Sequence, residues 1–331
     1  MYSEHFGFTD RPFQLTPDAR FYFGSRTHKK AMAYLGYGLA QGEGFIVITG
    51  DVGAGKSTLA AHLMATIDRA RLNAINIVST QVEGVDMLRL AAQGMGVPTA
   101  GVSKAQLLDE VARHLEDEAR RGKRTLLIVD EAQNLSETAL EELRMLSNFQ
   151  IGGQALLQTF LLGQPEFREK MASDSMEQLR QRVIATHHLE PMEPNEIEPY
   201  VTHRLKLVGW EGRPLIELPA FAEIYRYTAG VPRKVNQLAA RLLLHAAVEE
   251  LDAIDAETVA EVADDLDMDT PRPVLELTRP ASEPVRDLGL ERRVAELEAQ
   301  LDEQNRAVRR VLTLLLDWVE SEDQAALHDA A

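Results

Sequence analysis

A short apolar run opens directly into a glycine-rich loop at residues 45–58, and this junction constrains the fold more than any other feature of the chain. The loop fits the pattern G-x-x-x-x-G-K-[ST], whose fixed positions are Gly50, Gly55, Lys56 and Ser57. The preceding run, Phe-Ile-Val-Ile-Thr, has strand character, and apolar residues recur at helical spacing after the loop. A strand, a glycine turn and a helix in this order predict a P-loop for a nucleoside triphosphate.

The chemistry of such a loop follows from its backbone. Glycines let the backbone N–H groups approach an anion, and the start of the following helix adds a partial positive charge. Lys56 is expected to contribute a full charge to the phosphates, and the Ser57 hydroxyl is expected to hold Mg²⁺. The residues that we expect to bind the nucleotide here are Gly50, Asp51, Val52, Gly53, Ala54, Gly55, Lys56, Ser57 and Thr58.

Charge disfavours nucleic acid as the main partner. The 331 residues carry a formal net charge of −17, whereas binding to a nucleic acid backbone rests on neutralisation of phosphates by Lys and Arg. The densest basic run, at residues 120–124, lies between a helix and a strand without interleaved aromatic residues. We interpret this run as the cationic end of a helix.

The absence of cysteine excludes disulfides, thiolate nucleophiles and cysteine metal sites. The first residues lack the pattern of a signal peptide, and no apolar run approaches the ~20 residues of a membrane-spanning helix. The histidines show no metal-binding spacing, so Mg²⁺ bound with the nucleotide is the only metal expected. The sequence therefore predicts a cytoplasmic protein without a transmembrane segment.

Alternation of strand-like and helix-like segments predicts an α/β fold with a mostly parallel sheet. Strand-like runs lie at 45–49, 74–78, 125–129 and 157–162, and a fifth is expected at 186–189. From residue 195 to about 266 strand signals vanish and helical periodicity takes over. We expect a first segment with an aromatic strap and the first core helix at 1–44, an α/β core at 45–192 and a helical lid at 193–267.

The last sixty residues have a different character. Prolines recur at 268–287, which predicts a linker. Apolar residues then repeat at alternating steps of four and three through 288–320, broken in the seam only by Gln304. This pattern predicts a coiled coil that pairs with itself or with a partner, although a single amphipathic helix would show a similar stripe. The final residues, 321–331, are expected to be a disordered tail.

Two carboxylates end the apolar run at 125–129. Asp130 is expected to hold Mg²⁺ together with Ser57, and Glu131 to orient or deprotonate the attacking water, which are the two roles of a Walker B strand. Gln164 ends another apolar run and is expected to reach the γ-phosphate or the water from the other side, the alternative being a role in the turn before Pro165. The sequence thus predicts hydrolysis as well as binding.

Two arginines precede the fifth expected strand. A guanidinium there suits an arginine finger that stabilises the γ-phosphate on a neighbouring subunit, whereas the plain alternative is a solvated helix face. Of Arg180 and Arg182, which we expect on a helix, Arg182 is the better candidate.

Taken together, these motifs resemble those of the AAA+ ATPases. A narrower resemblance, covering about residues 2–266, is to the ExeA/GspA-type secretion ATPases, whose relatives accompany exosortase (PEP-CTERM) and exopolysaccharide export systems. It is carried by Leu-Arg-Gln-Arg-Val at 179–183, Gly-Val-Pro-Arg-Lys-Val-Asn at 230–236, Gly-Gln-Pro-Glu at 163–166 and the aromatic residues of the first segment. The resemblance implies a P-loop AAA+ fold with a small helical lid.

The resemblance also implies roles for particular residues. Arg233 matches the sensor-2 arginine, which reaches from the lid to the phosphates. The aromatic strap with Phe6, Phe13, Phe21 and Phe23 is similar to the segment near the adenine, although buried aromatics more often simply pack. The sequence departs from the secretion type after residue 266, where that type continues into a membrane span and a cell-wall-binding region.

The expected function is therefore ATP hydrolysis, with ATP and Mg²⁺ as cofactors, coupled to envelope secretion or exopolysaccharide export. We expect a homo-oligomer, as a ring or through the coiled coil, that serves export machinery at the inner membrane from the cytoplasm or as a peripheral protein. A DNA-binding regulator of the transposition type is the alternative, since transposition ATPases are more distant kin. A scaffold whose assembly is switched by nucleotide is a third possibility.

Overall fold

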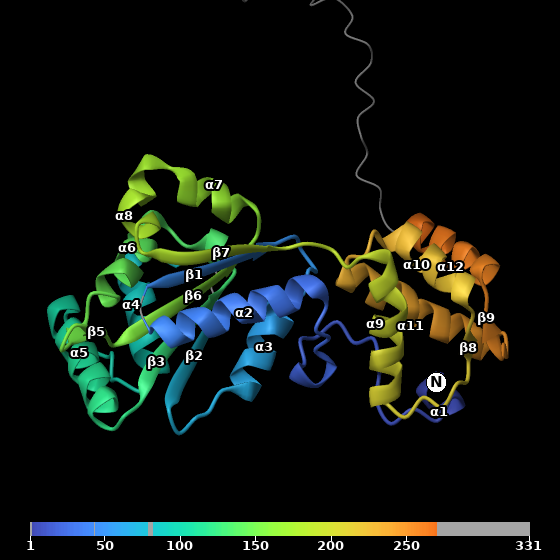
Figure 1. Cartoon of the computed structure of the whole chain (residues 1–331), viewed down its shortest axis with the longest axis horizontal. Coiled ribbons are helices and arrows are strands. Elements are labelled where there is room, and N and C mark those ends of the chain that lie inside the picture. The colour runs from blue at the N-terminus through green and yellow to red at the C-terminus, as the bar shows by residue number, and fades with distance from the viewer. Residues whose placement is uncertain (1, 43, 79–81, 270–331) are drawn as a thin grey trace, which may run out of the picture. The chain divides into compact units, whose positions relative to one another are not determined.

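The computed structural model describes residues 2–42, 44–78 and 82–269. Residues 1–270 form one compact unit (Figure 1). The expected coiled coil at 288–320, the tail at 321–331 and all but the first two residues of the expected linker lie outside the described part of the chain.

A five-stranded parallel sheet forms the centre of this unit, in the order β2-β3-β6-β1-β7. Its strands are β1 (Phe45–Gly50), β2 (Leu72–Val78), β3 (Arg124–Asp130), β6 (Leu157–Gly163) and β7 (Val183–Leu189). Each strand expected from the sequence is present, and each neighbouring pair is parallel. The order places β1, which leads into the glycine-rich loop, between β6 and the edge strand β7.

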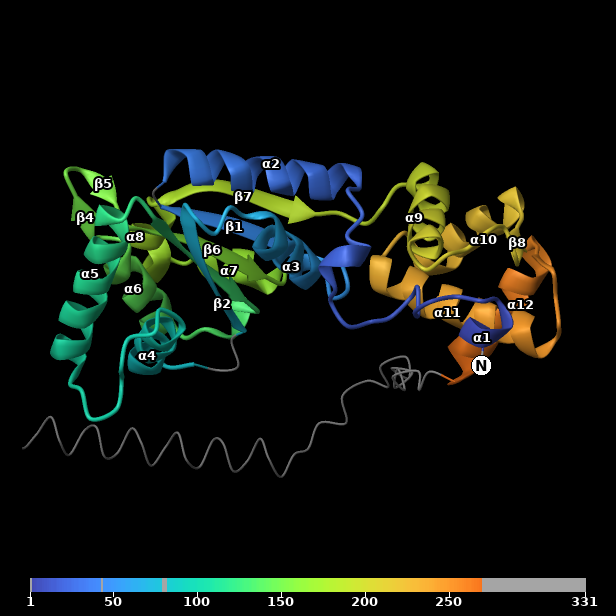
Figure 2. The same cartoon turned by 90° about the horizontal axis from the view of Figure 1, so that it is seen from below.

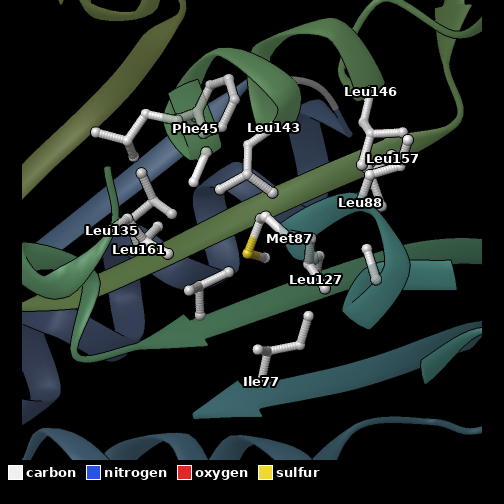
Figure 3. Close-up of a cluster of buried hydrophobic side chains, with 14 of the residues drawn as sticks. Phe45, Ile77, Met87, Leu88, Leu127, Leu135, Leu143, Leu146, Leu157 and Leu161 are labelled. Carbon is white, nitrogen blue, oxygen red and sulfur yellow. The ribbon is translucent and has the colours of Figure 1, made fainter. Parts of the chain in front are cut away.

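Helices cover both faces of the sheet, which explains why its central strands are almost uninterrupted runs of apolar residues. On one face lie α2 (Arg26–Gln41) and α3 (Lys56–Thr66), with α2 running along β1 and β7 (Figure 2). On the other lie α4 (Gly84–Gly94), α5 (Lys104–Arg120), α6 (Glu137–Leu146) and α7 (Glu166–Ala172). The side chains of α4, α6, β1, β3 and β6 meet there in one buried cluster, so the strand ends are held rigidly (Figure 3).

Two short segments connect the larger elements. A two-stranded hairpin, β4 (Gln150–Ile151) and β5 (Gln154–Ala155), turns at two glycines with positive φ and precedes β6. The short helix α8 (Glu177–Arg180) precedes β7. It ends before Arg182, so the expectation that Arg182 lies on a helix was wrong. A 3₁₀ turn at Asp174–Met176 and α8 together connect α7 to the edge strand.

Residues 194–269, which we call the helical region, contain α9 (Pro194–Leu207), α10 (Leu218–Thr228), α11 (Pro232–Val248) and α12 (Ala256–Asp269). Prolines stand in the first turn of α9, α10 and α11, where the missing N–H is not needed. The expectation of a strand-free region was wrong in one detail, because β8 (Leu215–Ile216) and β9 (Ala253–Ile254) pair in parallel. Strands of two residues are too short to show a sequence period.

The beginning of the chain packs against the helical region. The short helix α1 (Tyr2–His5) contacts α11, and Phe8, Phe13 and Phe21 are buried in the same apolar core as the side chains of α9, α10 and α11. We call residues 6–23 the N-terminal strap. The burial of these phenylalanines agrees with a packing role, the plainer of the two interpretations that the sequence allowed, while Phe21 and Phe23 also line a cavity beside the glycine-rich loop.

Candidate nucleotide site

The strand order brings three sequence motifs to one edge of the sheet. Since neighbouring parallel strands end on the same side, the loop after β1, the pair Asp130–Glu131 after β3 and Gln164 after β6 lie together. Gln164 comes between the other two because β6 lies between β1 and β3. Crevices outside the carboxyl ends of such strands are where α/β folds bind ligands.

The loop itself has the backbone of an anion-binding turn. Gly53 and Gly55 have φ of +86° and +94°, which side chains other than glycine rarely adopt, and Gly55 caps α3. Gly50 and Ala54 close the turn against Leu189, while Val52 is exposed at its tip. Lys56 begins α3 and is 6% exposed, and its Nζ donates to the carbonyl oxygens of Gly50 at 2.6 Å and Asp51 at 3.0 Å.

Burial lowers the pKa of Lys56, while the carboxylates of Glu131 and Asp130 act in the opposite direction. A further negative charge nearby would therefore stabilise the charged form of Lys56. A phosphate group would supply such a charge, and the lysine would exchange loop carbonyls for phosphate oxygens.

Neighbouring elements enclose the loop so closely that glycine is required on steric grounds as well. A Cβ on Gly53 would lie 2.4 Å from Cβ of Arg233, and a Cβ on Gly55 would lie 2.8 Å from Nε2 of His28. The Arg233 N–H donates to the Gly53 carbonyl at 3.2 Å. The first turn of α11 thus contacts the P-loop. It carries Arg233, the residue predicted to be the sensor-2 arginine.

His28 supports the loop from the other side. Its Nδ1 lies 2.7 Å from the Ser25 hydroxyl, and the same hydroxyl oxygen accepts the His28 backbone N–H at 3.4 Å. This contact holds the ring with Nε2 facing the loop. Burial lowers the pKa of His28 to about 4, so the imidazole is neutral at physiological pH.

Asp130 and Ser57 form the predicted Mg²⁺ pair. The Ser57 hydroxyl donates to Asp130 Oδ2 at 2.6 Å, and Asp130 Oδ1 accepts the Glu131 backbone N–H at 2.9 Å. Asp130 is almost completely buried, and its charge is held by these two donors. A hydroxyl and a carboxylate side by side are oxygen ligands of the kind that Mg²⁺ prefers with nucleotide phosphates, so the residues present fit this ion.

Glu131 is the most constrained residue of the site. Its backbone is left-handed, with φ of 55°, an uncommon conformation for a residue with a side chain. Its Oε2 accepts hydrogen bonds from Nε2 of Gln133 and from Nε2 of Gln164, the latter at 3.1 Å. Gln133 Oε1 in turn accepts the Gln164 backbone N–H at 3.0 Å, which closes a small ring of hydrogen bonds.

Two opposing effects set the pKa of Glu131. Burial by itself raises it, but the hydrogen bonds from Gln133 and Gln164 and the charge of Lys56 lower it further, so the net pKa lies below the usual value. The carboxylate is therefore ionised at neutral pH. A side chain in this state accepts a proton or orients a water, and it does not act as an acid.

The two candidate arginine fingers lie away from the P-loop. Arg182 precedes β7 and its carbonyl accepts the Phe45 N–H at the amino end of β1, on the opposite edge of the sheet from the loop. Its guanidinium donates to Ser147 Oγ at 3.0 Å, whereas Arg180 donates to the carbonyl oxygens of Met171 and Ser173. Both guanidinium groups are thus engaged by hydrogen bonds within the chain.

A cavity of about 180 Å³ joins these groups to the helical region and the N-terminal strap. Its polar end is lined by Lys56, Ser57, Thr58, Glu131 and Gln164. Its other end is lined by aromatic and buried residues from the strap and from α9 and α11, namely Phe21, Tyr22, Phe23, Tyr200, Arg204 and Asn236. Tyr22 also stacks on His62 of α3 with ring centroids 3.8 Å apart. One end thus suits phosphates and the other a planar base.

Several residues of this site were not identified from the sequence, among them Gln133, His28, Tyr200 and Arg204. Gln133 carried little signal, because its role depends on a 3₁₀ turn after β3 that folds it back onto Glu131. His28 was considered only as a metal ligand, and its contact with Gly55 depends on how α2 packs. A polar residue within three positions of a Walker B pair was the one available hint for Gln133.

A family model described as an AAA domain matches residues 39–171. This part of the chain is similar to an AAA domain. The General secretion pathway protein A of Aeromonas hydrophila is 33% identical to it over 247 residues, which are 74% of this chain and 45% of that protein. The present sequence therefore spans about half the length of this relative.

Solved structures confirm the P-loop AAA+ fold predicted from the sequence. The Aeropyrum pernix ORC2 protein, in ADPNP–ADP complexes, has a TM-score of 0.57 and 18% identity, covering 78% of this chain and 72% of that one. Cdc6p from Pyrobaculum aerophilum has a TM-score of 0.56 and 18% identity, covering 77% and 70%. Drosophila ORC bound to DNA has a TM-score of 0.55 and 17% identity, covering 80% and 65%. At these identities the likeness concerns the fold.

The described residues contain neither a further candidate metal site nor a helix that could span a membrane. Among residues 2–42, 44–78 and 82–269, no group of three or more His, Asp or Glu side chains is arranged to hold a metal ion. Within that same part of the chain, every helix is too short or too polar to cross a bilayer.

Proposed function

We propose that this chain binds ATP with Mg²⁺ between its α/β core and the helical region, and hydrolyses it to ADP and phosphate. The observation that carries the proposal is the Glu131 carboxylate, held by Gln133 and Gln164 in the cavity that Lys56 and Ser57 also line. Binding alone would not require a partly buried, ionised carboxylate there. In this proposal all nine P-loop residues, from Gly50 to Thr58, bind the nucleotide.

In this proposal each polar group has one task. The N–H groups of the P-loop and Lys56 hold the β- and γ-phosphates, and Ser57 and Asp130 hold Mg²⁺, which supplies charge neutralisation when bound. Glu131 orients a water and accepts its proton as the water oxygen bonds to the γ-phosphorus. The bond from that phosphorus to the bridging oxygen breaks, and the oxygen leaves with ADP. Gln164 steadies the carboxylate and the attacking water.

The helical region acts as a lid, with Arg233 as its contact to the phosphates. The cavity of about 180 Å³ is smaller than the ~300–1,000 Å³ of typical ligand pockets, so the lid and strap must move outward to admit a nucleotide. The Cβ of Arg233 lies against Gly53, and the side chain is exposed. Its guanidinium can therefore turn toward a bound γ-phosphate. Binding and hydrolysis would then shift the lid between two positions.

Subunit coupling is proposed through Arg182, with Arg180 as the alternative. Either guanidinium would be presented to the γ-phosphate of a neighbouring copy, as the position of both beside the edge strand β7 allows. The linker at 268–287 and the coiled coil at 288–320 would carry the lid motion to a partner or to another copy. We propose domain boundaries at 1–44 for the first segment, 45–192 for the α/β core and 193–267 for the lid.

We propose a cellular role by analogy with the relative. Similarity to a general secretion pathway protein supports a part in envelope secretion, performed by a cytoplasmic protein that attaches peripherally at the inner membrane. Within that role we propose export of exopolysaccharide by an exosortase-linked system, on the sequence motifs alone. The test is a deletion strain complemented with wild type or with Lys56→Ala. Restored secretion or polysaccharide output with the wild type only supports the role, and equal output from both strains contradicts it.

A DNA-dependent role is the second candidate, because one similar fold was solved bound to DNA. The net charge of −17 counts against it. A gel-shift at low salt with and without ATP separates the two. Strong, salt-sensitive and ATP-dependent binding would favour the regulator, and no shift would favour the export ATPase.

A further inference from the structure

A chain of three buried polar side chains runs from the N-terminal strap to the cavity. Arg204, Tyr200 and Asn236 are 6%, 5% and 7% exposed. Arg204 donates from Nε to the Pro12 carbonyl at 2.7 Å, from Nη2 to the Gln14 carbonyl at 3.4 Å and from Nη1 to the Tyr200 hydroxyl at 2.8 Å. The Tyr200 hydroxyl donates to Asn236 Oδ1 at 2.8 Å. The chain thus links the strap, α9 and α11.

The direction of these hydrogen bonds is fixed by the donors and acceptors that the three side chains offer. A guanidinium only donates, so the Tyr200 oxygen must accept from Arg204, and its single hydrogen must go to Asn236. An acceptor is needed there, which places Oδ1 toward the tyrosine and leaves the Nδ2 amide group on the other side. With the amide turned round, the hydroxyl hydrogen would have no acceptor. In the described part of the chain Nδ2 has no hydrogen-bond partner.

Packing alone does not account for Asn236. Arg204 and Tyr200 tie the strap to α9, and the guanidinium lies over the rings of Phe21 and Tyr200 at 4.8 and 5.7 Å. Nδ2 is not among the fully enclosed polar atoms without a partner, so this donor keeps access to open space although the residue as a whole is nine-tenths buried. The unused donor borders the cavity, since Asn236 is one of its lining residues.

The position of Asn236 points to the base of a nucleotide. It lies three residues after Arg233, so both occupy the same face of α11, and the Arg233 N–H fixes that face on Gly53 of the P-loop. Phosphates at the P-loop would leave the base at the aromatic end of the cavity, beside Asn236. Among the described residues that line the cavity, Glu131 is the only carboxylate, and it lies at the phosphate end.

We propose that Asn236 reads the base, donating from Nδ2 to a ring nitrogen and selecting adenine over guanine. The N1 atom of adenine accepts a hydrogen bond, whereas guanine presents N–H donors at N1 and N2 on the same edge. These donors would face the N–H₂ group of Asn236 and find no carboxylate at that end of the cavity. A site built around such a polar group rejects a mismatched partner strongly. This inference rests on the proposed nucleotide binding.

The test measures binding of non-hydrolysable ATP and GTP analogues by calorimetry to the full chain. Asn236→Asp keeps the shape but replaces the donor with an acceptor, and the matched control is Asn195→Asp at an exposed position in the first turn of α9. The wild type should prefer the ATP analogue by roughly tenfold or more, and Asn236→Asp should reduce this ratio by about tenfold or reverse it. The control should leave the ratio unchanged.

Tyr200→Phe provides a second readout that does not alter the donor itself. Without the hydroxyl, Asn236 is no longer held in one orientation, so the ATP to GTP ratio should fall by about threefold, while thermal unfolding confirms that the variant is folded. Ratios within twofold of wild type in both variants would overturn the assignment of Asn236. No binding of either analogue to the wild type would instead refute the proposed function, so the two failures are distinguishable.

Discussion

The two ends of the nucleotide cavity are built in different ways. The phosphate end comes from one continuous loop and three adjacent strand ends, and its polar groups already satisfy one another, as in the pairs Ser57–Asp130 and Gln164–Glu131. The base end comes from the strap, α9 and α11, which are distant in sequence, and it holds a buried arginine that contacts carbonyls and aromatic rings. One end is therefore local and charged, and the other is assembled and largely apolar.

The two ends therefore differ in whether a single side chain determines the chemistry or the geometry. At the phosphate end the strands fix the positions, so a change of one side chain removes chemistry but leaves the geometry. At the base end the geometry itself depends on the packing of the strap on the helical region, so a change of one side chain moves its neighbours as well. Variants at the two ends should accordingly differ in whether they alter turnover, binding or stability.

The largest effect is expected from Glu131→Gln. The amide keeps the shape but cannot accept a proton, so ATP turnover should fall by about 100-fold or more while ATP binding is retained. Phosphate release and analogue binding measure the two separately. Glu137→Gln, at the start of α6, serves as the control. Turnover within a few-fold of wild type would remove Glu131 from the reaction.

Arg233→Ala tests the junction between the two ends. Loss of the guanidinium should lower turnover by roughly 10- to 100-fold, because a charge that stabilises the transferring phosphate is removed. The neighbouring, exposed Lys234→Ala should have little effect. Equal loss in both variants would indicate general damage to α11 and contradict a specific contact with phosphate.

Gln133→Leu should have a moderate effect that depends on pH. In the wild type the hydrogen bonds to Glu131 hold its pKa below the usual value, so their partial loss raises that pKa. The acid limb of the pH dependence of turnover should therefore move to higher pH, with about a fivefold loss at neutral pH. An unchanged acid limb together with reduced turnover would mean that Gln133 acts in some other way.

The smallest effect on turnover, and a clear one on stability, is expected from His28→Gln. Burial lowers the pKa of His28 to about 4. Between about pH 6.5 and pH 4 the unfolded chain therefore binds a proton at His28 that the folded chain does not bind. This contribution is fully present above pH 6.5 and is lost as the pH falls through 4, up to about 3 kcal/mol. Denaturant unfolding at several pH values should show a flatter acid profile for His28→Gln than for wild type and for the exposed control His5→Gln.

The sequence predicted the phosphate end far better than the base end, for a physical reason. The strand runs, Gly50 to Thr58 and the pair Asp130–Glu131 are local patterns, and the parallel sheet brings such strand ends together in a predictable way. Gln133 and His28 depend on a turn and on helix packing, and the base end depends on Arg204 and Tyr200 of α9 meeting Asn236 of α11. The pairing of β8 with β9 was missed because two-residue strands leave no period to detect.

The backbone of Gly230 has a mechanical consequence. Its carbonyl accepts the Met192 N–H at 2.9 Å, and a Cβ at this position would lie 2.1 Å from the Met192 carbonyl oxygen. The chain leaving β7 is thus clamped to the turn before α11. A small tilt of the edge strand would be passed on to the base of a 17-residue helix about 25 Å long. A rotation of about 10° there would displace the far end by about 4 Å. A small movement at β7 would therefore become a larger displacement at the carboxyl end of α11.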